Sequence, residues 1–565
     1  TGSVNFVTGT SSVYVKGTTG TSLTNTYSGG GKIAVNLGGS TNVFDFSVTQ
    51  AKNGASGSFT GELVLEKAGY HLYDDEGELA SATLVTSGGG YVTVNAGSDI
   101  ANHKVDGLSL YGGTLDFGLM TEGSESGQIV VGSDGFATNA SKTVVKVALG
   151  ENNNATGSDV FDLNSDLSVL LIKGFNASGR DLDSLDFSGS AEVDQLVKQS
   201  GRYADGSATA ELTYSSGHLV GDESGISAAW DLSKINLLAG NEEGFRIDAS
   251  AETGQSGTIS AYITGEGSIE FAGGTITLNH ANDYTGSTNV TGGELVLAVN
   301  EALGNTKVLD ISSGNVAIGG TTQTIGAIEV DAAGHFTMGG AGKLVLSDDS
   351  YINSANTGVT GTIQLSGAGT ELTLRDMQAA GAVPGSSVYQ PNSRGATIEL
   401  GEGTSVILAF GDRSGGNSDE VYNRLTGSGT VQIGDGDNDA YVELSNFDNH
   451  FGTLLVKNNS AVLVNDMHSG NGSINGSKVV VEKGGLARLF GNKNWTFTND
   501  LDLKAGGELV ISAGGTGGNY NTVQFAGSVD QQIDIGGTVS LQTTHLYLGG
   551  KEGVQADIDL SLIHI

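Results

Sequence analysis

The feature that most constrains this chain is a unit of about twenty residues that recurs along it. The clearest pair is LDISSGNVAIGG (309–320), which is followed in register by IEVDAAGHFTMGG (328–340). Each unit is a short alternating strand, a turn closed by glycine, a second alternating strand and a glycine pair. Antiparallel hairpins of a sandwich could produce such strands. The near-constant unit length and the Val, Ile and Leu alternation favour stacked coils that share one apolar interior.

The composition agrees with a chain that turns often and pairs its backbone almost everywhere. Glycine accounts for 91 of 565 residues, whereas proline, which cannot donate to a β-ladder, occurs twice. The formal net charge is −37, which argues against nucleic acid and anionic membranes as partners. There is no cysteine, so disulfides and thiolate chemistry are excluded.

A longer repeat is carried by two stretches and a partial third. Residues 263–269 (ITGEGSI) match 425–431 (LTGSGTV), and residues 282–297 (NDYTGSTNVTGGELVL) align without gaps to 448–463 (DNHFGTLLVKNNSAVL). A third copy begins with FTGELVL at 59–65. The pattern resembles the autotransporter-associated β-strand repeat of passenger domains of the AIDA and pertactin type. The residues that carry it are Tyr284, Gly286, Val290, Gly293, Leu295, Leu297, Phe451, Gly452, Val456, Leu463, Phe59 and Gly61.

That resemblance implies an all-β fold, a pectin-lyase-like right-handed parallel β-helix with coils of roughly 20 residues. It also implies type V secretion, display at the bacterial cell surface, and a C-terminal outer-membrane barrel that this sequence does not contain. The last six residues, LSLIHI (560–565), read as the translation of a sequencing adapter, as in a truncated metagenomic fragment. We therefore expect the natural C-terminus, with the barrel, to be missing.

Shifts in the pattern suggest a division of the chain. The predicted stretches are an N-terminal β-helix (1–139), an irregular or decorated stretch or excursion (140–250), β-helix with the repeat (251–374), loop insertions (375–424), β-helix with the repeat (425–559) and the adapter scar (560–565). Within the irregular stretch, AEVDQLVKQ (191–199) has the apolar spacing of a short helix. Both prolines, Pro384 and Pro391, fall in the predicted insertions.

Candidate chemistry is sparse. Asp435, Asp437 and Asp439 place oxygen ligands at alternate positions, as a calcium loop does. Ala440 and Asn446 stand where an EF-hand needs glycine and glutamate, so an acidic turn is the favoured interpretation and calcium a weak one. A carbohydrate-active enzyme would need acids in a column on neighbouring coils, beside a basic residue, and no column with a period of twenty is evident. We therefore predict no catalytic residue, no cofactor and no enzymatic activity.

The sequence thus predicts a surface-displayed passenger that acts as an adhesin or self-associates. Its partners would be a second copy, or a host, matrix or glycan ligand, together with its own outer-membrane barrel. Three alternatives stay open: a carbohydrate-active β-helix enzyme, a passive scaffold whose active part lay in the missing ends, and a β-helix of two-partner secretion or of a phage fibre.

Overall fold

The computed structural model divides the chain into two compact units. The first comprises residues 1–155, 164–197 and 211–235, and the second comprises 156–163, 198–210 and 236–565. Together they contain about 18 turns of a parallel β-solenoid, with no α-helix among the described residues, so the predicted all-β solenoid is confirmed. The described residues are 3–22, 26–45, 59–72, 79–94, 102–120, 127–149, 152–157, 167–199, 208–240, 244–249, 256–381, 395–416, 418–437, 439–446, 448–465, 474, 477–491, 495–512, 521–525, 531–542, 544–548 and 556–560.

The N-terminal part of the first unit is a stack of parallel, in-register strands. β2, β5, β7, β9 and β10 pair in succession, which places Ile33, Leu63, Leu84 and Leu108 in one fully buried column. Alternate residues of a strand point to opposite faces, so this column forms the apolar interior. The strands up to residue 237 are β1 Ser3–Phe6, β2 Ser12–Lys16, β3 Thr21–Ser22, β4 Thr26–Gly29, β5 Lys32–Asn36, β6 Val43–Asp45, β7 Glu62–Lys67, β8 Gly69–His71, β9 Thr83–Thr93, β10 Asn102–Met120, β11 Gln128–Thr138, β12 Thr143–Leu149, β13 Asn152–Gly157, β14 Leu167–Lys173, β15 Leu185–Gly189, β16 Glu192–Gln199, β17 Ala210–Gly221 and β18 Gly225–Leu237.

The predicted irregular stretch contains a break in the parallel pattern. β12 still pairs β15 in parallel, but β14 pairs β18 antiparallel over Leu167–Lys173. The helix predicted over 191–199 is wrong, because Glu192–Gln199 is the strand β16. Its buried positions are Val193, Gln195, Val197 and Gln199, a period of two that uses glutamine where the sequence pattern pointed to Leu196.

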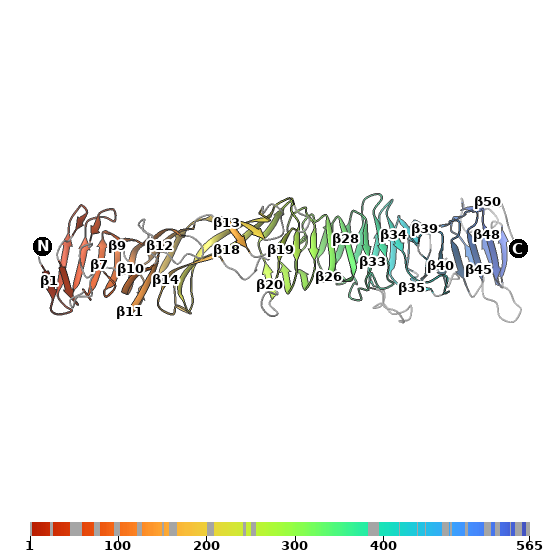
Figure 1. Ribbon diagram of the computed structural model, residues 1–565. Coiled ribbons are helices and arrows are strands. Elements are labelled where there is room, and N and C mark those ends of the chain that lie inside the picture. The colour runs from red at the N-terminus through yellow and green to blue at the C-terminus, as the bar shows by residue number, and fades with distance from the viewer. Residues whose placement is uncertain are drawn as a thin grey trace. The chain divides into compact units, whose positions relative to one another are not determined.

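The second unit is organised around one 17-stranded sheet. At its start, two lines of parallel strands, β19–β22–β24 and β20–β23–β25, meet at the long strand β26. From β28 to β50 its strands follow one another as successive rungs (Figure 1), each paired in parallel with its neighbour in the stack. Smaller sheets of 5, 6 and 3 strands complete the coils of the unit. The strands are β19 Phe245–Ile247, β20 Ser256–Ile259, β21 Tyr262–Gly265, β22 Ile269–Phe271, β23 Thr275–Leu278, β24 Thr288–Val290, β25 Glu294–Leu297, β26 Val308–Gly319, β27 Thr322–Ile325, β28 Ala327–Met338, β29 Lys343–Leu346, β30 Ser350–Ile352, β31 Thr362–Leu365, β32 Glu371–Leu374, β33 Thr397–Leu400, β34 Ser405–Leu408, β35 Asp419–Val421, β36 Arg424–Gly427, β37 Thr430–Ile433, β38 Ala440–Leu444, β39 Thr453–Val456, β40 Ser460–Val464, β41 Lys478–Val481, β42 Leu486–Phe490, β43 Trp495–Phe497, β44 Leu501–Leu503, β45 Glu508–Ser512, β46 Asn521–Phe525, β47 Gln531–Ile535, β48 Thr538–Gln542, β49 Thr544–Leu548 and β50 Ala556–Leu560.

The interior of this unit is a continuous apolar column. Each rung of the large sheet contributes one inward side chain that stacks on the next, and all of them are buried. Burial of apolar surface is the main favourable contribution to folding, and no single coil could supply it alone. The column reads Phe271, Val290, Ile311, Val330, Ile352, Leu374, Leu408, Ile433, Val456, Val481, Leu503 and Ile535.

The repeat recognised in the sequence is confirmed where its two clearest copies lie. β26 and β28 are parallel 12-residue strands in which Leu309 lies opposite Ile328 and Val316 opposite Phe336. The turn glycines Gly293 and Gly314 have φ of 71° and 86°, a left-handed conformation that favours glycine.

The stretch 375–424, where loop insertions are predicted, also contains regular strands of the solenoid. Within it, β33 and β34 are ordinary rungs: β33 pairs β31 and β36, and β34 pairs β32 and β37, all in parallel. The interior side chains Ile398, Val406 and Leu408 explain this, because they restore the period of two between the polar segments. Both prolines lie outside the described residues, as does 561–565 of the predicted adapter scar.

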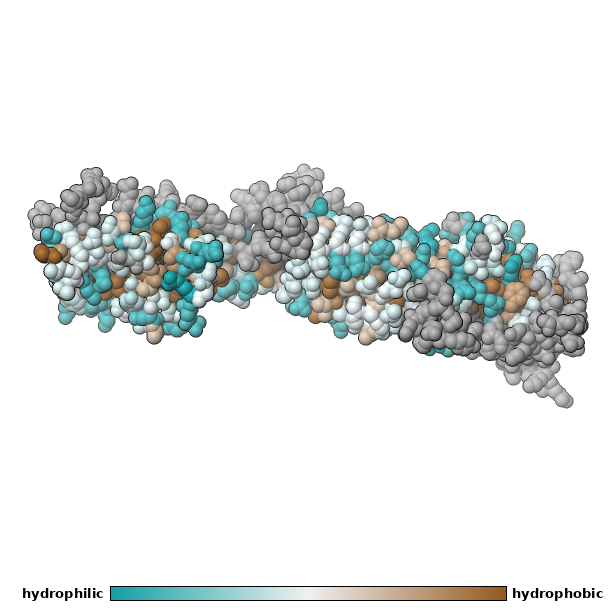
Figure 2. Space-filling view, turned by 90° about the horizontal axis from the view of Figure 1, so that it is seen from below, coloured by the Kyte–Doolittle hydropathy of each residue, from teal (hydrophilic) through white to brown (hydrophobic). Residues whose placement is uncertain are grey.

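The outer surface of the second unit is polar. On the face seen in Figure 2, hydrophilic and intermediate side chains predominate in its coloured part, with brown confined to scattered spots. Among the described residues, the exposed large apolar side chains are Val7, Tyr14, Leu119 and Val220, all of them in the first unit.

Candidate functional site: a polar groove on the second unit

Parallel in-register pairing sets one outward residue of each coil directly above the outward residue of the next. From β19 to β30, this outward line comprises Arg246, Glu270, Asn289, Asp310, Glu329 and Tyr351. We call these six residues the polar column. Neighbouring rungs of a sheet are about 4.8 Å apart, so consecutive side chains of the column are within reach of one another.

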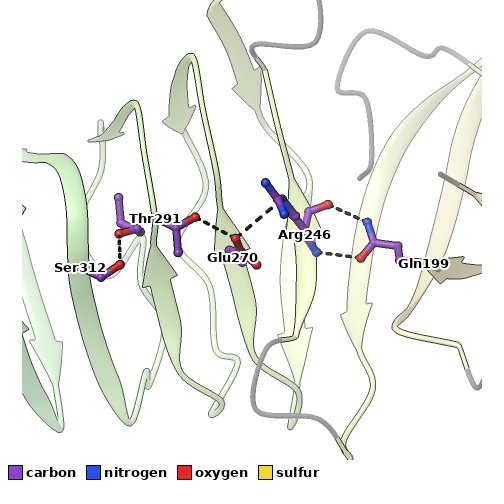
Figure 3. A network of polar contacts seen from close by, with 6 residues as sticks. Gln199, Arg246, Glu270, Thr291 and Ser312 are labelled. Carbon is purple, nitrogen blue, oxygen red and sulfur yellow. Dashed lines mark hydrogen bonds and ion pairs between the residues drawn. The ribbon is translucent and has the colours of Figure 1, made fainter. Parts of the chain in front are cut away.

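The upstream end of the polar column makes contacts within the protein (Figure 3), although the buried Arg246 Nε has no hydrogen-bond partner among the described residues. The Gln199 side chain forms a pair of hydrogen bonds with the Arg246 backbone: Nε2 donates to the carbonyl oxygen at 2.7 Å, and Oε1 accepts from N–H at 2.8 Å. This amide therefore takes the place of a neighbouring strand at the edge of β19. Arg246 Nε lies 3.7 Å from Glu270 Oε1, which also accepts a hydrogen bond of 2.7 Å from Thr291 Oγ1. On the next coil, Ser312 Oγ donates to the Val290 carbonyl oxygen at 3.4 Å.

Further along, the polar column borders a groove of about 570 Å³. This volume falls within the range of small-ligand sites, roughly 300–1,000 Å³. The groove lies where the chain enters the strands of the large sheet, and several coils contribute to it. Its lining residues are Glu266, Ser268, Thr285, Gly286, Ser287, Asn289, Lys307, Val308, Asp310 and Glu329.

Close backbone contact between coils shapes the floor of this groove. A Cβ at Gly286 would lie 2.0 Å from the Gly267 carbonyl oxygen, and one at Gly326 would lie 2.1 Å from that of Lys307. No real Cβ tolerates such distances, so glycine is required where these coils meet.

The electrostatics of the groove are dominated by carboxylates that face one another. Burial raises the pKa of Asp310, and the negative charges of Glu329 and Asp331 raise it further. Burial, together with the same acidic neighbours, raises the pKa of Tyr351 to about 12, and its O–H donates to Glu329 Oε2 at 3.4 Å. In the described part of the chain, no hydrogen bond or ion pair reaches the Asp310 carboxylate or Lys307 Nζ.

Sequence reasoning missed this site because the coils differ in length. Successive members of the polar column from Glu270 to Tyr351 are 19, 21, 19 and 22 residues apart. A search for acids at a constant period of twenty therefore finds no column. The structure nevertheless brings acids together beside a basic residue, since Asp310, Glu329 and Lys307 line one groove. An alignment of successive strands from one turn to the next, in place of a constant period, would have put Asp310 beside Glu329.

The residues of the predicted repeat motif serve mainly the interior. The aromatic residues Phe59, Tyr284 and Phe451 are buried, and each is followed within two positions by a glycine. A Cβ at Gly61, Gly286 or Gly452 would lie 1.7–2.1 Å from a carbonyl oxygen of the preceding coil. The motif therefore marks a corner where an aromatic side chain fills the interior and the backbone passes close to the next coil. The remaining apolar members Val290, Leu295, Leu297 and Val456 are also buried.

One member of the motif does not share the inward position of its counterpart. The gap-free alignment equates Leu463 with Leu297, which points inward, but Leu463 points outward and packs against Tyr441, Ala461 and Leu486. Three residues separate the two strands in both copies, but the inward side chain after the turn lies five residues after Val290 in one copy (Leu295) and six after Val456 in the other (Val462). A slip of one residue exchanges the two faces of a strand.

The weak calcium candidates do not converge. Arg375 Nη1 lies 3.8 Å from Asp435 Oδ2, whereas the Asp439 carboxylate accepts hydrogen bonds from the backbone N–H groups of Arg413 and Ser414 at 3.0 and 2.8 Å. Asp437 lines a separate surface hollow together with Asp439 and Arg413. Across the described ranges, no three or more His, Asp or Glu side chains gather in a way that could hold a metal ion.

Comparisons with known proteins give distant relatives. No protein-family model matches the chain, and no solved structure matches it. It is 29% identical over 355 residues to the uncharacterized protein YuaQ of Escherichia coli (strain K12), covering 59% of this chain and 25% of that protein. It is 25% identical over 549 residues to the uncharacterized lipoprotein YdeK of the same organism, covering 87% and 39%.

A third relative has a function in its name. The chain is 30% identical over 160 residues to the adhesin BmaC autotransporter of Brucella suis biovar 1, covering 24% of this chain and 5% of that protein. The chain thus spans well under half the length of these relatives. The likeness to the autotransporter-associated β-strand repeat, which no family model matches, stays a prediction. Where the chain is described, it contains no helix with the length and hydropathy that a membrane crossing requires.

Proposed function

We propose that this chain is part of the surface-displayed passenger of a bacterial autotransporter and acts there as an adhesin, through contact with a ligand or a second copy. The observation that carries the proposal is a solenoid with a buried apolar interior whose outer face presents polar side chains in register. Such a surface suits extended polar contact. The similarity to a Brucella suis adhesin supports the same role, and a lipoprotein relative agrees with a place in the cell envelope.

The test is display on living cells. Residues 1–559 are fused to a known outer-membrane barrel, exposure is confirmed by added protease, and settling and attachment to coated surfaces are compared with cells that carry the barrel alone. Mixing labelled displaying cells with unlabelled barrel-only cells separates the two modes: clumps of displaying cells alone indicate self-association, whereas attachment to a coated ligand indicates a foreign partner. Confirmed exposure with neither clumping nor attachment would refute the adhesin role.

A second candidate, a carbohydrate-active enzyme, is favoured by one observation. Asp310 and Glu329 lie on adjacent rungs in one groove, and the pKa of Asp310 is raised, as glycosidic acids require. We propose binding without turnover, because both carboxylates project from the same face of one sheet, whereas a glycosidase needs its two carboxyl groups to flank the scissile bond. Incubation of the purified chain with oligosaccharides decides between the two, since new reducing ends that vanish in Glu329→Gln would establish the enzyme.

A further inference from the structure

The polar column changes character along its length. At its upstream end, Glu270 accepts a hydrogen bond from Thr291 and faces Arg246. Two rungs on, the described residues offer the Asp310 carboxylate no partner, and the same holds for Lys307 Nζ beside it. A partly buried charge without a partner costs stability. The half-buried Asp310 carboxylate is therefore unsatisfied within the protein and available to a ligand, and the exposed Lys307 ammonium is free to contact the same ligand.

The chemistry of the lining narrows the class of ligand. Glu266, Asp310 and Glu329 are acceptors, Lys307 is a donor, and the serine and threonine hydroxyls act as both. A lipid or an apolar peptide would find one apolar side chain, Val308. Three carboxylates against one ammonium repel phosphates, nucleic acids and acidic sugars. A ligand whose hydroxyls both donate and accept fits every group in the groove.

From this we infer that the groove binds an uncharged, hydroxyl-rich oligosaccharide chain that runs along the polar column. The inference deepens the proposed adhesin function, on which it rests, by naming the class of ligand. The rung spacing of about 4.8 Å is close to the length of one sugar ring. Successive sugar units therefore meet Asn289, Asp310 and Glu329 in turn, because these residues occupy consecutive rungs in register.

Neighbouring residues hold the groove in this form. Tyr351, on the rung after Glu329, donates its O–H to that carboxylate and fixes one end of the groove. Gly286 lines the floor, where the close passage of Gly267 leaves no room for a side chain. A preformed site of this kind loses little conformational freedom when a ligand binds.

The experiment is a titration of the purified full chain with three probes: cellotetraose and the fully N-acetylated chitotetraose, which are uncharged, and tetragalacturonate, which is anionic. Calorimetry is run on the wild type, on Asp310→Asn and Glu329→Gln, and on Glu294→Gln as the control. Glu294 lies on β25, in the same stretch of coils but outside the groove, where it accepts a hydrogen bond of 2.9 Å from Asn315. Circular dichroism confirms that each variant folds.

We expect at least one uncharged tetraose to bind, and its Kd to rise about tenfold or more in either groove variant, as the loss of a hydrogen bond to a charged group implies. Glu294→Gln should leave the Kd unchanged, and tetragalacturonate should bind far more weakly. The inference is overturned if neither uncharged probe binds, if the groove variants bind as the wild type does, or if the anionic probe binds equally well.

The same variants in the display test keep the two proposals apart. Wild-type cells that clump or attach, with a purified chain that binds no tetraose, would leave the adhesin role standing and remove the groove as its site. A chain that binds a tetraose through Asp310 and Glu329, on cells that neither clump nor attach, would leave the groove inference standing and refute the adhesin role.

Discussion

The buried phenol of Tyr284 makes the stability of the second unit depend on alkaline pH. Tyr284 is inaccessible to solvent, and its Oη lies 2.7 Å from Thr288 Oγ1, which in turn lies 2.6 Å from Thr306 Oγ1. Burial raises the pKa of Tyr284 from 10.0 to about 12. In the unfolded chain, the phenol ionises near its ordinary pKa of about 10. The folded state is therefore fully favoured below pH 10 and loses stability as the pH rises from about 10 to 12.

The size of the effect follows from this pKa difference. A pKa raised by two units corresponds to about 2.7 kcal/mol of stability lost once both states are ionised. Substitution Tyr284→Phe removes one hydrogen bond, at a cost of about 1 kcal/mol at pH 8, while the bond between Thr288 and Thr306 persists. The variant has no phenol to ionise. The wild type should thus be more stable at pH 8 and the variant more stable above about pH 11.

Urea unfolding followed by far-UV circular dichroism measures this reversal at intervals between about pH 8 and pH 11.5. Other tyrosines and lysines also titrate in this range, so the quantity of interest is the difference in unfolding free energy between the wild type and Tyr284→Phe. Tyr14→Phe serves as the comparison, because Tyr14 is 55% exposed and its pKa is raised chiefly by its hydrogen bond to Glu66; it should give a smaller pH dependence. If the difference for Tyr284→Phe stays constant across the range, the phenol is not buried as the structure has it.

Three further predictions follow from the same coils. Gly286→Ala should lower the free energy of unfolding by about 1–3 kcal/mol in denaturant titrations, because its Cβ would meet the Gly267 carbonyl oxygen, whereas Gly340→Ala, with open space around it, should change it by less than about 0.5 kcal/mol. Asp310→Asn should stabilise the chain at neutral pH and have no effect on its stability below the ordinary pKa of aspartate. A raised pKa means that the stability is present at low pH and is lost as the pH rises. Equal effects of the substitution at both pH values would contradict the repulsion from Glu329 and Asp331. Displaying cells should clump faster when the ionic strength rises from about 0.01 to 0.15 M. The net charge of −37 opposes side-by-side contact of two copies, and salt screens this repulsion because the Debye length falls from roughly 30 to 8 Å. Slower clumping in salt would instead indicate ion pairs between copies.

The fold was predictable because the same local signals for strand and turn recur in each repeat unit. Alternation at Leu309 and Ile311 or at Ile328 and Val330 specifies strands with one buried face, and Gly314 specifies the turn. These signals need no knowledge of distant contacts. Where the strand and turn signals weaken, as at 191–199, the apolar spacing fits a helix as well as a strand. In the structure this segment is a strand, and Gln195 and Gln199 occupy buried positions that the apolar pattern did not mark.

The candidate site was not predictable in the same way, because it depends on which residues share a column. That depends on the length of every coil between them, and the coils of the polar column differ by one to three residues. The copy at β40 shows how little is needed, since a shift of one residue after Val456 places Leu463 on the outer face.

By itself, then, the sequence determined an all-β chain of stacked coils, with an apolar interior, glycine turns and an acidic surface, because each of these follows from local periodicity and composition. Only the tertiary structure decided which outward residues become neighbours. Asn289, Asp310 and Glu329 form one groove with Lys307 because hydrogen bonds between coils fix the register, whatever the number of residues each coil contains.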